Sequence, residues 1–548
     1  RICVVEVAGR RNLAPACATR CTEGMVVKTS TLRVMNARKV VAELILSDHP
    51  NDCLTCPKCG NCELQTLALR FNIREMPFNG GELSPRKREV TSSIVRNMDK
   101  CIFCRRCESV CNDVQTVGAL GAIRRGFNTT IAPAFDRMMK DSECTYCGQC
   151  VAVCPVGALT ERDYTNRLLD DLADPDKIVI VQTAPAVRAA LGEEFGLPPG
   201  TLVTGKMVYA LRELGFDYVF DTDFAADVVI MEEGTELLDR IRNGGALPMF
   251  TSCCPGWINY AEKHCPDILP RLSSTRSPQA VFGALAKTYL PEKMGMAPQR
   301  IRVISIMPCI AKKDEAARAE LASGGIPDVD VVITVREFAR LLRRMGVDLA
   351  SIEPEPFDNP FMSASTGAAV IFGSTGGVME AAVRTVYAVL NGKEMESIES
   401  APLRGMDGVR EADIDLGPGN GSIRVAICHG LRNARRLAEE ALAGTSPYTF
   451  IEVMACPGGC VDGGGTSRVK GDYHPCAVKR QQGLYAIDRA MPRRQSHNNP
   501  QVKKLYEDFL GAPNSHKAHE LLHTGYADRR REPSESILAN KERLTLTD

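Results

Sequence analysis

Cysteine is the residue type with the greatest chemical potential in this sequence. The chain has 23 cysteines among 548 residues, and 15 of them lie in residues 1–154. Disulfide-rich scaffolds are short secreted chains, whereas C-x-x-C spacing in a long chain indicates metal binding. The sequence therefore predicts metal centres in a reducing compartment, most simply the cytoplasm.

Two stretches repeat one spacing, CIFCRRCESVC and CTYCGQCVAVCP. This spacing is typical of ferredoxins with two 4Fe–4S clusters, in which three close thiolates hold one cluster and the fourth cysteine holds the other. Zinc ribbons are the alternative, although zinc sites usually take two C-x-x-C pairs. The predicted ligands are Cys101, Cys104, Cys107 and Cys154 for one cluster, and Cys144, Cys147, Cys150 and Cys111 for the second.

A third 4Fe–4S site is predicted upstream, in HPNDCLTCPKCGNCELQ. We favour the ligand set His49, Cys53, Cys56 and Cys62, in which an imidazole replaces one thiolate and changes the cluster charge and reduction potential. Cys59 leaves a second set open, because Cys53, Cys56, Cys59 and Cys62 are evenly spaced. In the first set Cys59 is a spare thiol near the cluster.

Cys3 and Cys17 resemble the last two ligands of plant-type 2Fe–2S domains, where one cysteine opens a strand and the next follows a turn. Such a cluster needs four ligands, and two of them would have to precede Arg1. We therefore expect the 2Fe–2S site to be incomplete on this chain alone. A start at Arg1 instead of methionine suggests a fragment.

The elements that must position the other eight cysteines lie after residue 154, where strand and helix patterns alternate. This alternation predicts an α/β domain with a parallel sheet. Apolar runs predict strands at 177–182, 227–231, 248–251, 302–306, 329–335, 424–428 and 449–454.

Several of these runs end immediately before a cysteine-bearing loop. Cys253 and Cys254 follow one, Cys309 follows another, and Cys456 and Cys460 follow a third. Ligands of open α/β sheets bind beyond the carboxyl ends of the strands, so we expect the loops to meet at one site. Adjacent side chains of an extended segment point in opposite directions. One cluster is therefore not expected to bind both Cys253 and Cys254.

Three stretches of these loops, TSCCPGW, MPCIAKKDE and EVMACPGGCVDGGG, resemble the signatures of the iron–iron hydrogenases. The upstream cluster motifs match the accessory domain of that family, so the resemblance covers nearly the whole chain. It implies an H-cluster, whose 4Fe–4S part is joined through Cys460 to a diiron unit carrying carbonyl, cyanide and an azadithiolate. The implied ligands of the 4Fe–4S part are Cys254, Cys309, Cys456 and Cys460.

The resemblance also assigns residues to the diiron pocket. Lys312 would donate a hydrogen bond to a cyanide. Met307 and Met454 are soft, adaptable side chains suited to pack there, and ordinary core is the alternative for each. The other lining residues would be Pro185, Ala186 and Gln279. Ala186 stands where some relatives have serine, so one cyanide would lose a hydrogen bond.

Splitting H2 releases protons, and the resemblance implies a path from Cys253 through a water to Glu233, Ser273 and Glu236, with Arg240 at the last station. A free thiol has a pKa of about 8.5, near enough to neutrality to pass on a proton. Glu233 and Glu236 are three residues apart, which places them on one face of a helix. The alternative for both is a charge at a helix start, which the helix dipole favours.

The implied fold is an α/β catalytic domain with the H-cluster between two lobes, preceded by α+β ferredoxin-like iron–sulfur domains. Five parts are expected: a truncated plant-type 2Fe–2S ferredoxin-like domain (1–30), a His/Cys-ligated 4Fe–4S domain (31–85), a two-cluster 4Fe–4S ferredoxin-like domain (86–168), the H-cluster domain (169–490), and a tail resembling the family's small subunit (491–548).

Two further motifs suggest other chemistry. HELLH at 519–523 matches a zinc-protease pattern, but no third ligand histidine follows it. The glycine-rich stretch at 373–384 lacks the lysine of a phosphate-binding loop and the full dinucleotide fingerprint. We expect neither a zinc site nor a nucleotide site from these motifs.

The predicted function is reversible oxidation of H2 to protons and electrons. The accessory clusters would pass electrons to ferredoxin or to flavin- and NAD(P)-binding and 2Fe–2S partner subunits, as in electron-bifurcating hydrogenases. A sensory hydrogenase, or a hydrogenase-like iron–sulfur assembly protein without turnover, is the alternative. With 67 basic and 67 acidic residues and no apolar run of about 18 residues, neither nucleic acid nor a membrane span is expected.

Overall fold

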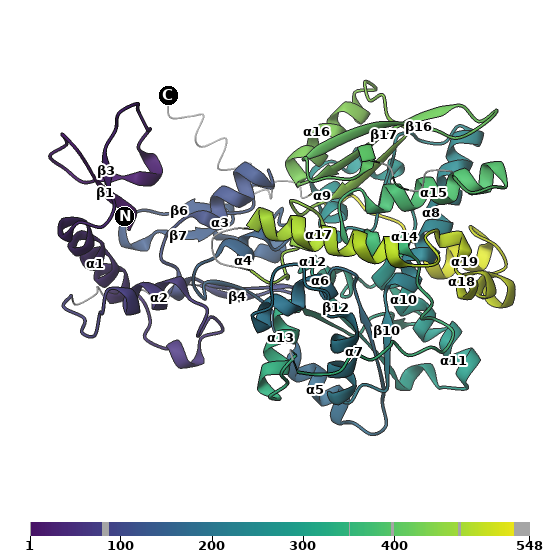
Figure 1. The fold of residues 1–548 in the computed structure, drawn as a ribbon, viewed down its shortest axis with the longest axis horizontal. Helices are drawn as coiled ribbons and strands as arrows, with labels where there is room; N and C mark the ends of the chain where they lie inside the picture. The colour runs from purple at the N-terminus through teal and green to yellow at the C-terminus, as the bar shows by residue number, and fades with distance from the viewer. Residues whose placement is uncertain are drawn as a thin grey trace, which may run out of the picture.

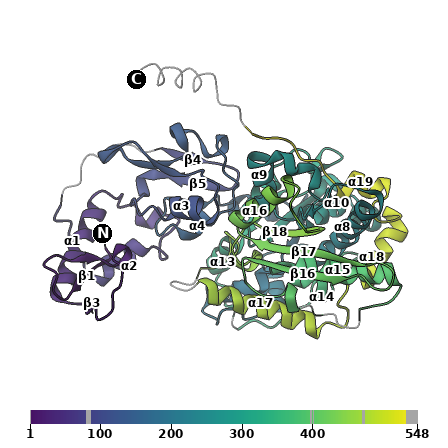
Figure 2. The ribbon, with the colours of Figure 1, turned by 90° about the horizontal axis from the view of Figure 1, so that it is seen from above.

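The computed structural model describes residues 2–78, 87–349, 351–395, 399, 401–468 and 473–530. Elements from the first third of the chain lie at one end of the long axis, and the remaining elements form a larger part with two lobes (Figure 1; Figure 2). None of the helices in the described ranges is both long and apolar enough to cross a membrane.

The N-terminal part consists of short elements separated by cysteine-rich turns. A small sheet has the order β2-β1-β3, and an antiparallel sheet has the order β4-β5-β8. The bounds are β1 Val4–Val7, β2 Ala14–Pro15, β3 Val27–Lys28, α1 Leu32–Ser47, α2 Glu63–Arg70, β4 Arg88–Val90, β5 Ile94–Asn97, α3 Arg106–Ser109, β6 Gly121–Ile123, β7 Thr130–Ala132, α4 Gln149–Val153 and β8 Leu159–Glu161.

The first lobe is a parallel sheet with the order β10-β9-β12-β15. Its strands are β9 Ile178–Thr183, β10 Tyr218–Asp221, β12 Ile301–Met307 and β15 Val331–Thr334. Almost every residue of these strands is buried, as expected when helices cover both faces of a parallel sheet. The accompanying helices are α5 Thr165–Ala173, α7 Thr204–Glu213, α10 Pro278–Lys287, α11 Tyr289–Met294, α12 Ala311–Glu315 and α13 Val335–Arg344.

The second lobe is a mixed sheet with the order β11-β18-β17-β16, in which only β16 runs antiparallel to its neighbour. Its strands are β11 Met249–Phe250, β16 Val409–Asp415, β17 Ser422–His429 and β18 Phe450–Met454. The helices α9 Pro255–His264, α15 Gly377–Asn391 and α16 Leu431–Leu442 belong to this lobe, and α17 Tyr473–Ala490 runs across both lobes (Figure 1). The larger part therefore has two sheets, one in each lobe.

The structure confirms six of the seven predicted strands and corrects the seventh. Residues 227–231 lie inside α8 Asp223–Asn243, a 21-residue helix. This stretch of α8 is buried almost all round, and periodicity cannot distinguish such a helix from a buried strand. Among the strands of the two lobe sheets, the prediction missed β10 and β16.

The last described segment packs against α8 and α10. It contains α18 Pro500–Leu505, a turn of π-helix at Tyr506–Leu510 and α19 His516–Leu522. Ser515 caps α19 by accepting a hydrogen bond from the Ala518 backbone. After α19 the chain pairs with the loop before α10, through Arg276 N to Leu522 O at 2.7 Å and Thr524 N to Ser274 O at 2.8 Å.

The N-terminal part is joined to the lobes through the cysteine loops. Tyr146, Trp257, Ile310 and Ala455 belong to one continuous cluster of buried apolar residues. Gly148 has a φ of 77°, and a Cβ there would lie 2.7 Å from the Ile310 side chain. This close approach places the predicted Cys144 cluster beside the loop that carries Cys309.

Candidate active site and metal centres

Three strand-end loops meet at a mostly apolar cavity of about 80 Å³ between the lobes. Cys253 and Cys254 follow β11, Cys309 follows β12, and Cys460 lies in the loop after β18; all four line the cavity. The Ala455 backbone N–H donates to Cys254 Sγ at 3.3 Å, which brings the loop of Cys456 against Cys254. The predicted convergence of the three loops is therefore confirmed.

Backbone contacts fix the loop between Cys456 and Cys460. Gly459 has a φ of 86°, and a Cβ there would lie 2.8 Å from both Met454 Sδ and Thr375 N. The Gly458 N–H donates to His429 Nδ1 at 3.0 Å, and His429 Nε2 lies 3.0 Å from Met406 O. Glycine is needed here for a positive φ and for close approach of the backbone.

The chemistry of these thiols fits an iron–sulfur cluster. Burial raises the pKa of Cys456 to about 12 and raises the pKa of Cys309 well above its ordinary value, with neighbouring cysteines adding to both shifts. Four thiolates gathered in this mostly apolar site would need a positively charged centre to offset their charge. Among the described residues, no three His, Cys, Asp or Glu side chains lie close enough together to hold a single metal ion. A 4Fe–4S cubane holds its ligands farther apart than a single ion does.

Lys312 is the cation of the cavity wall. Its Nζ lies 2.8 Å from Glu315 Oε2 and 3.3 Å from the Cys253 carbonyl oxygen. Burial opposes the charge of Lys312, but Glu315 outweighs it and raises the lysine pKa. The Gln279 amide nitrogen donates to Glu315 Oε2 at 2.9 Å, which leaves Gln279 Oε1 buried and without a partner among the described residues. Glu315 was not predicted from the sequence.

The other residues predicted to surround the pocket all line this cavity. They are Pro185, Ala186, Met307 and Met454. Thr222 and Phe372 also line it and were missed. Thr222 follows β10. Because this strand was not predicted, the sequence did not indicate that Thr222 lies at a strand end near the site.

The predicted proton path continues from Cys253 into α8. Glu233 and Glu236 lie in the middle of this helix, so the helix-start alternative is wrong. Burial raises the pKa of Glu233 to about 8, and the negative charge of Glu236 adds to the shift. Neither carboxylate oxygen of Glu233 makes a hydrogen bond of good geometry within the described chain, although the Ser273 side chain and the Ser252 backbone lie near enough to lower its pKa. A buried carboxyl group that is protonated near neutral pH suits proton transfer.

Several hydrogen-bond donors meet at the carboxylate of Glu236, the next carboxyl group of the predicted path. Ser273 Oγ donates to its Oε2 at 3.0 Å, and Arg240 Nη2 donates to its Oε1 at 2.6 Å. Ser274, which was not predicted, donates from both its backbone N–H and its hydroxyl. Ser273 is fully buried, whereas the side chains of Glu236 and Arg240 are 13% and 16% exposed, so the path reaches solvent there.

The predicted ligands of the two ferredoxin-like clusters surround two small cavities. One cavity is lined by Cys101, Cys104, Cys107 and Cys154, and the other by Cys111, Cys144, Cys147 and Cys150. In each set the fourth cysteine comes from the other sequence run. The second cavity adjoins the central site, since Cys456 Sγ lies 3.9 Å from the Cys147 carbonyl oxygen.

His49 has the environment of a ligand. Its Nδ1 lies 2.9 Å from the Pro50 carbonyl oxygen, and its Nε2 is buried with no partner among the described residues. Burial lowers the pKa of His49, which keeps the imidazole neutral and able to bind iron. Cys62 is buried, whereas Cys59 is exposed. This contrast favours the set without Cys59.

The other predicted sulfur and histidine motifs have different surroundings. Cys3 Sγ and Cys17 Sγ lie 3.2 Å apart. Within HELLH the rings of His519 and His523 stack 4.1 Å apart, and His523 bonds to Ser274 and Glu232. The start of α15, inside the glycine-rich stretch, is occupied by a buried carboxylate that was not predicted: Glu452 accepts from Gly376 N at 2.6 Å and Met379 N at 2.7 Å.

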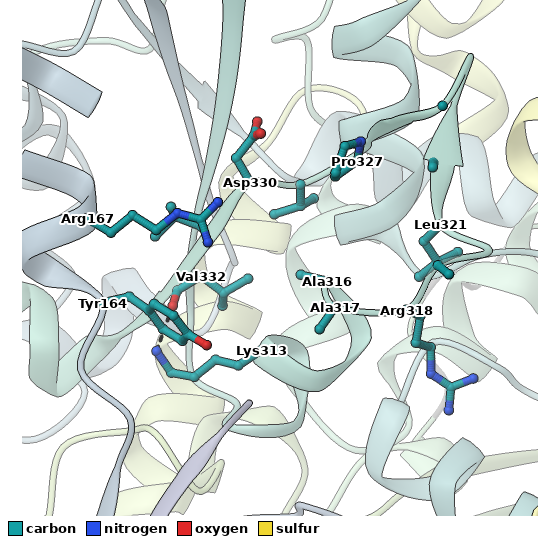
Figure 3. A pocket seen from close by; sticks show the side chains of 15 residues that line it. Tyr164, Arg167, Lys313, Ala316, Ala317, Arg318, Leu321, Pro327, Asp330 and Val332 are labelled. Atoms are coloured by element: carbon teal, nitrogen blue, oxygen red, sulfur yellow. Dashed lines mark hydrogen bonds between the residues drawn. The ribbon is translucent and has the colours of Figure 1, made fainter. Parts of the chain in front are cut away.

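A larger cavity, of about 400 Å³, lies beside the edge strand β15 (Figure 3). Lys313 reaches into it but bonds to the Val332 carbonyl oxygen at 2.6 Å and to Glu337 at 2.9 Å. Asp330 pairs with Lys287 and Arg302. These charges are already balanced within the protein, and no cysteine lines this cavity.

Family models match most of the chain. Residues 177–464 match the iron only hydrogenase large subunit, C-terminal domain, and residues 475–529 match the iron hydrogenase small subunit. Residues 38–77 match the NADH-ubiquinone oxidoreductase-G iron-sulfur binding region, and residues 91–160 match the ferredoxin-like domain of NADH-quinone oxidoreductase subunit 3.

Whole proteins of this kind are similar to the chain. The NADP-reducing hydrogenase subunit HndD of Solidesulfovibrio fructosivorans is 55% identical over 97% of this chain and 91% of its own length. Iron hydrogenase 1 of Clostridium pasteurianum is 39% identical over 96% and 92%. The apo [FeFe]-hydrogenase of Chlamydomonas reinhardtii superimposes with a TM-score of 0.60 at 41% identity, covering 68% of this chain and all of its own. The chain belongs to the iron-only hydrogenases.

Proposed function

We propose that this hydrogenase oxidises H2 reversibly at an H-cluster bound in the 80 Å³ cavity and exchanges electrons through three accessory 4Fe–4S clusters. The observation that carries the proposal is the shared lining of this cavity by three of the cluster thiols, Cys253 and Lys312. When bound, the H-cluster supplies the redox chemistry that separates H2 into protons and electrons. Its ligands would be Cys254, Cys309, Cys456 and Cys460.

The cavity wall provides a cation for anionic ligands. The Lys312 ammonium donates to both carboxylate oxygens of Glu315 and to the Cys253 carbonyl oxygen, and a bound cyanide would share or replace the longer of these contacts. Gln279, Met307 and Met454 line the same, mostly apolar space, where charge–dipole interactions are stronger than in water. Glu315 holds Lys312 in its charged form.

Cys253 starts the proton path that the chain itself supplies. Its thiol lines the cavity, and the carboxyl group of Glu233 lies beyond it in α8. Glu233 can exchange a proton with Cys253 through a water, and the Ser273 side chain lies beside its carboxyl group. Ser273 then passes the proton to Glu236, where Arg240 and solvent meet the path.

The accessory clusters would carry electrons between the cavity and an outside carrier. Their proposed ligands are the two ferredoxin-like sets and His49, Cys53, Cys56 and Cys62. The relative HndD is named as a subunit of an NADP-reducing hydrogenase. By this likeness we propose flavin-, NAD(P)- and 2Fe–2S-binding partner subunits, with ferredoxin as the alternative carrier.

Infrared spectroscopy tests the proposal. The chain, produced with a complete set of H-cluster maturation proteins, should show carbonyl and cyanide bands and oxidise H2. Absence of the bands would overturn the proposal. Bands without turnover would favour the sensory alternative, and an iron–sulfur assembly protein would show neither.

Cys253→Ser separates cofactor loading from proton transfer. A serine hydroxyl is a far weaker acid than a thiol, so turnover should fall by roughly 100-fold or more, while the infrared bands persist. Cys265→Ser, at a cysteine outside the cavity, is the control. Full activity of Cys253→Ser would contradict the proton path.

A further inference from the structure

A chain of polar contacts branches from the proposed proton path at Glu236 and ends in the C-terminal segment. Ser274 Oγ lies 3.2 Å from Glu236 Oε2 and 2.8 Å from His523 Nδ1. On the other side of the imidazole, His523 Nε2 lies 3.0 Å from Glu232 Oε2. His523 is 6% exposed and Glu232 is 0% exposed, so the branch is shielded from solvent.

Glu232 fixes the orientation of the imidazole. It accepts from the Tyr506 hydroxyl at 2.5 Å and from the Asn514 backbone N–H at 2.7 Å. The amide cannot give up its hydrogen, and burial together with Glu232 raises the pKa of Tyr506 well above its ordinary value. An ionised carboxylate can only accept, so against the carboxylate form of Glu232 the His523 Nε2 atom donates. The proton of Nδ1 is then the variable one.

The Ser274 hydroxyl can form a hydrogen bond with His523 Nδ1 in two arrangements. When its hydrogen points to Glu236, Nδ1–H donates to Ser274 and the imidazole is cationic. When its hydrogen points to Nδ1, the imidazole is neutral and Glu236 carries the proton. The two arrangements interconvert when Ser274 Oγ takes the Nδ1 proton while its own proton passes to a Glu236 carboxylate oxygen. One N–H and one O–H bond break, two O–H bonds form, and the total charge is unchanged.

We propose that His523 is an auxiliary proton site of the exit path, loaded from Glu236 through Ser274. This inference rests on the proposed function, in which Glu236 is the last carboxylate of the path. His523 is not among the residues that line the cavity, so it is a positioning residue that acts on Glu236 through Ser274.

Other charges around His523 are accounted for by the fold. Arg276 Nε donates to the His523 carbonyl oxygen at 2.9 Å, and its guanidinium pairs with Asp328. Arg240 pairs with Glu236 from the opposite side. On α19 itself, His519 stacks on His523, and His516 lies one turn earlier and is exposed.

Substitution of His523 in the cofactor-loaded enzyme tests the proposal through kinetics. For His523→Gln we expect a roughly tenfold lower kcat with unchanged KM for H2, since a remote station contributes less than a group at the reacting atoms. We also expect one ionisation to disappear from the pH–rate profile. His516→Gln, on the exposed face of the same helix, should match the unchanged enzyme. A wild-type pH–rate profile for His523→Gln would overturn the proposal.

A second measurement needs no activity. Nitrogen-15 signals of labelled histidine report imidazole protonation in protein that lacks the diiron unit, and His523→Gln identifies the signal among eight histidines. In Glu236→Gln the negative charge beside Ser274 is lost, so the His523 signal should change at a lower pH than in the unchanged protein. An identical pH response would refute the coupling. If the loaded enzyme showed no turnover, the proposed function would fail while this measurement still decided the inference.

Discussion

At the residue scale, the proposed proton path depends on the protonation of one buried carboxylic acid. Glu233 is 1% exposed, and its pKa is raised to about 8 by burial and by the charge of Glu236. It therefore carries a proton at neutral pH and can give or take one with little change in free energy. The raised pKa of Glu233 also makes the free energy of unfolding depend on pH.

The folded state holds a proton on Glu233 that the unfolded chain releases near its ordinary pKa of 4.5. Stability from this group is therefore fully present below pH 4.5 and is lost as pH rises through about 8. The glutamine of Glu233→Gln remains neutral at every pH. The melting temperature of this variant, relative to that of the wild type, should therefore rise as the pH is raised from 5 to 9. The corresponding free-energy change is at most about 5 kcal/mol.

Glu213→Gln, at an exposed glutamate, is the matched control and should follow the wild type at every pH. Glu233→Gln should also lower turnover by roughly 100-fold without loss of the infrared bands. A constant difference in melting temperature from pH 5 to 9 would show that Glu233 is ionised in the folded protein.

At the element scale, the sequence predicted the ends of strands better than it predicted the hydrogen bonds between elements that are far apart in the chain. The cysteine loops after β11, β12 and β18 were found because short buried strands end in recognisable turns. Residues 227–231 were misassigned, because an apolar run in a helix buried almost all round has no helical period. The links of His523 to Glu232 and of Glu452 to the start of α15 join residues 291 and 73 positions apart. Only the tertiary fold creates them.

The turn after β18 provides a prediction at this scale. Gly459→Ala would place a Cβ 2.8 Å from Met454 Sδ and Thr375 N, so the loop must shift and carry Cys460 with it. We expect lower cluster content and a loss of stability of roughly 1–3 kcal/mol, measured by iron analysis and thermal melting.

Gly444→Ala isolates the backbone part of this effect. Gly444 has a φ of 71°, but a Cβ added there would meet nothing within 4 Å, whereas Gly459 has a φ of 86° and is crowded. The control should lose about 1 kcal/mol from the left-handed conformation alone and keep its iron. Equal iron loss in both variants would mean that strain, not crowding, sets the position of Cys460.

At the scale of the whole molecule, the proposed electron and proton paths leave the cavity in different directions. The cluster domains lie at one end of the long axis, and α8, α10 and α19 lie at the other side of the lobes (Figure 1; Figure 2). The Cys147–Cys456 contact faces the clusters, whereas Glu236, Ser274 and His523 face the C-terminal segment. A cluster variant should therefore block electrons without blocking protons.

Cys104→Ser tests this separation, because Cys104 is an exposed member of the outer ferredoxin-like set. Electron transfer to ferredoxin should fall by roughly tenfold or more, with loss of one cluster signal in electron paramagnetic resonance. Isotope exchange between H2 and D2O needs no net electrons, so it should persist at nearly the wild-type rate. Cys59→Ser, at an exposed cysteine outside the favoured ligand set, should leave both reactions unchanged. A parallel loss of isotope exchange in Cys104→Ser would mean that the cluster domain supports the catalytic fold itself, and the two paths would not be separable.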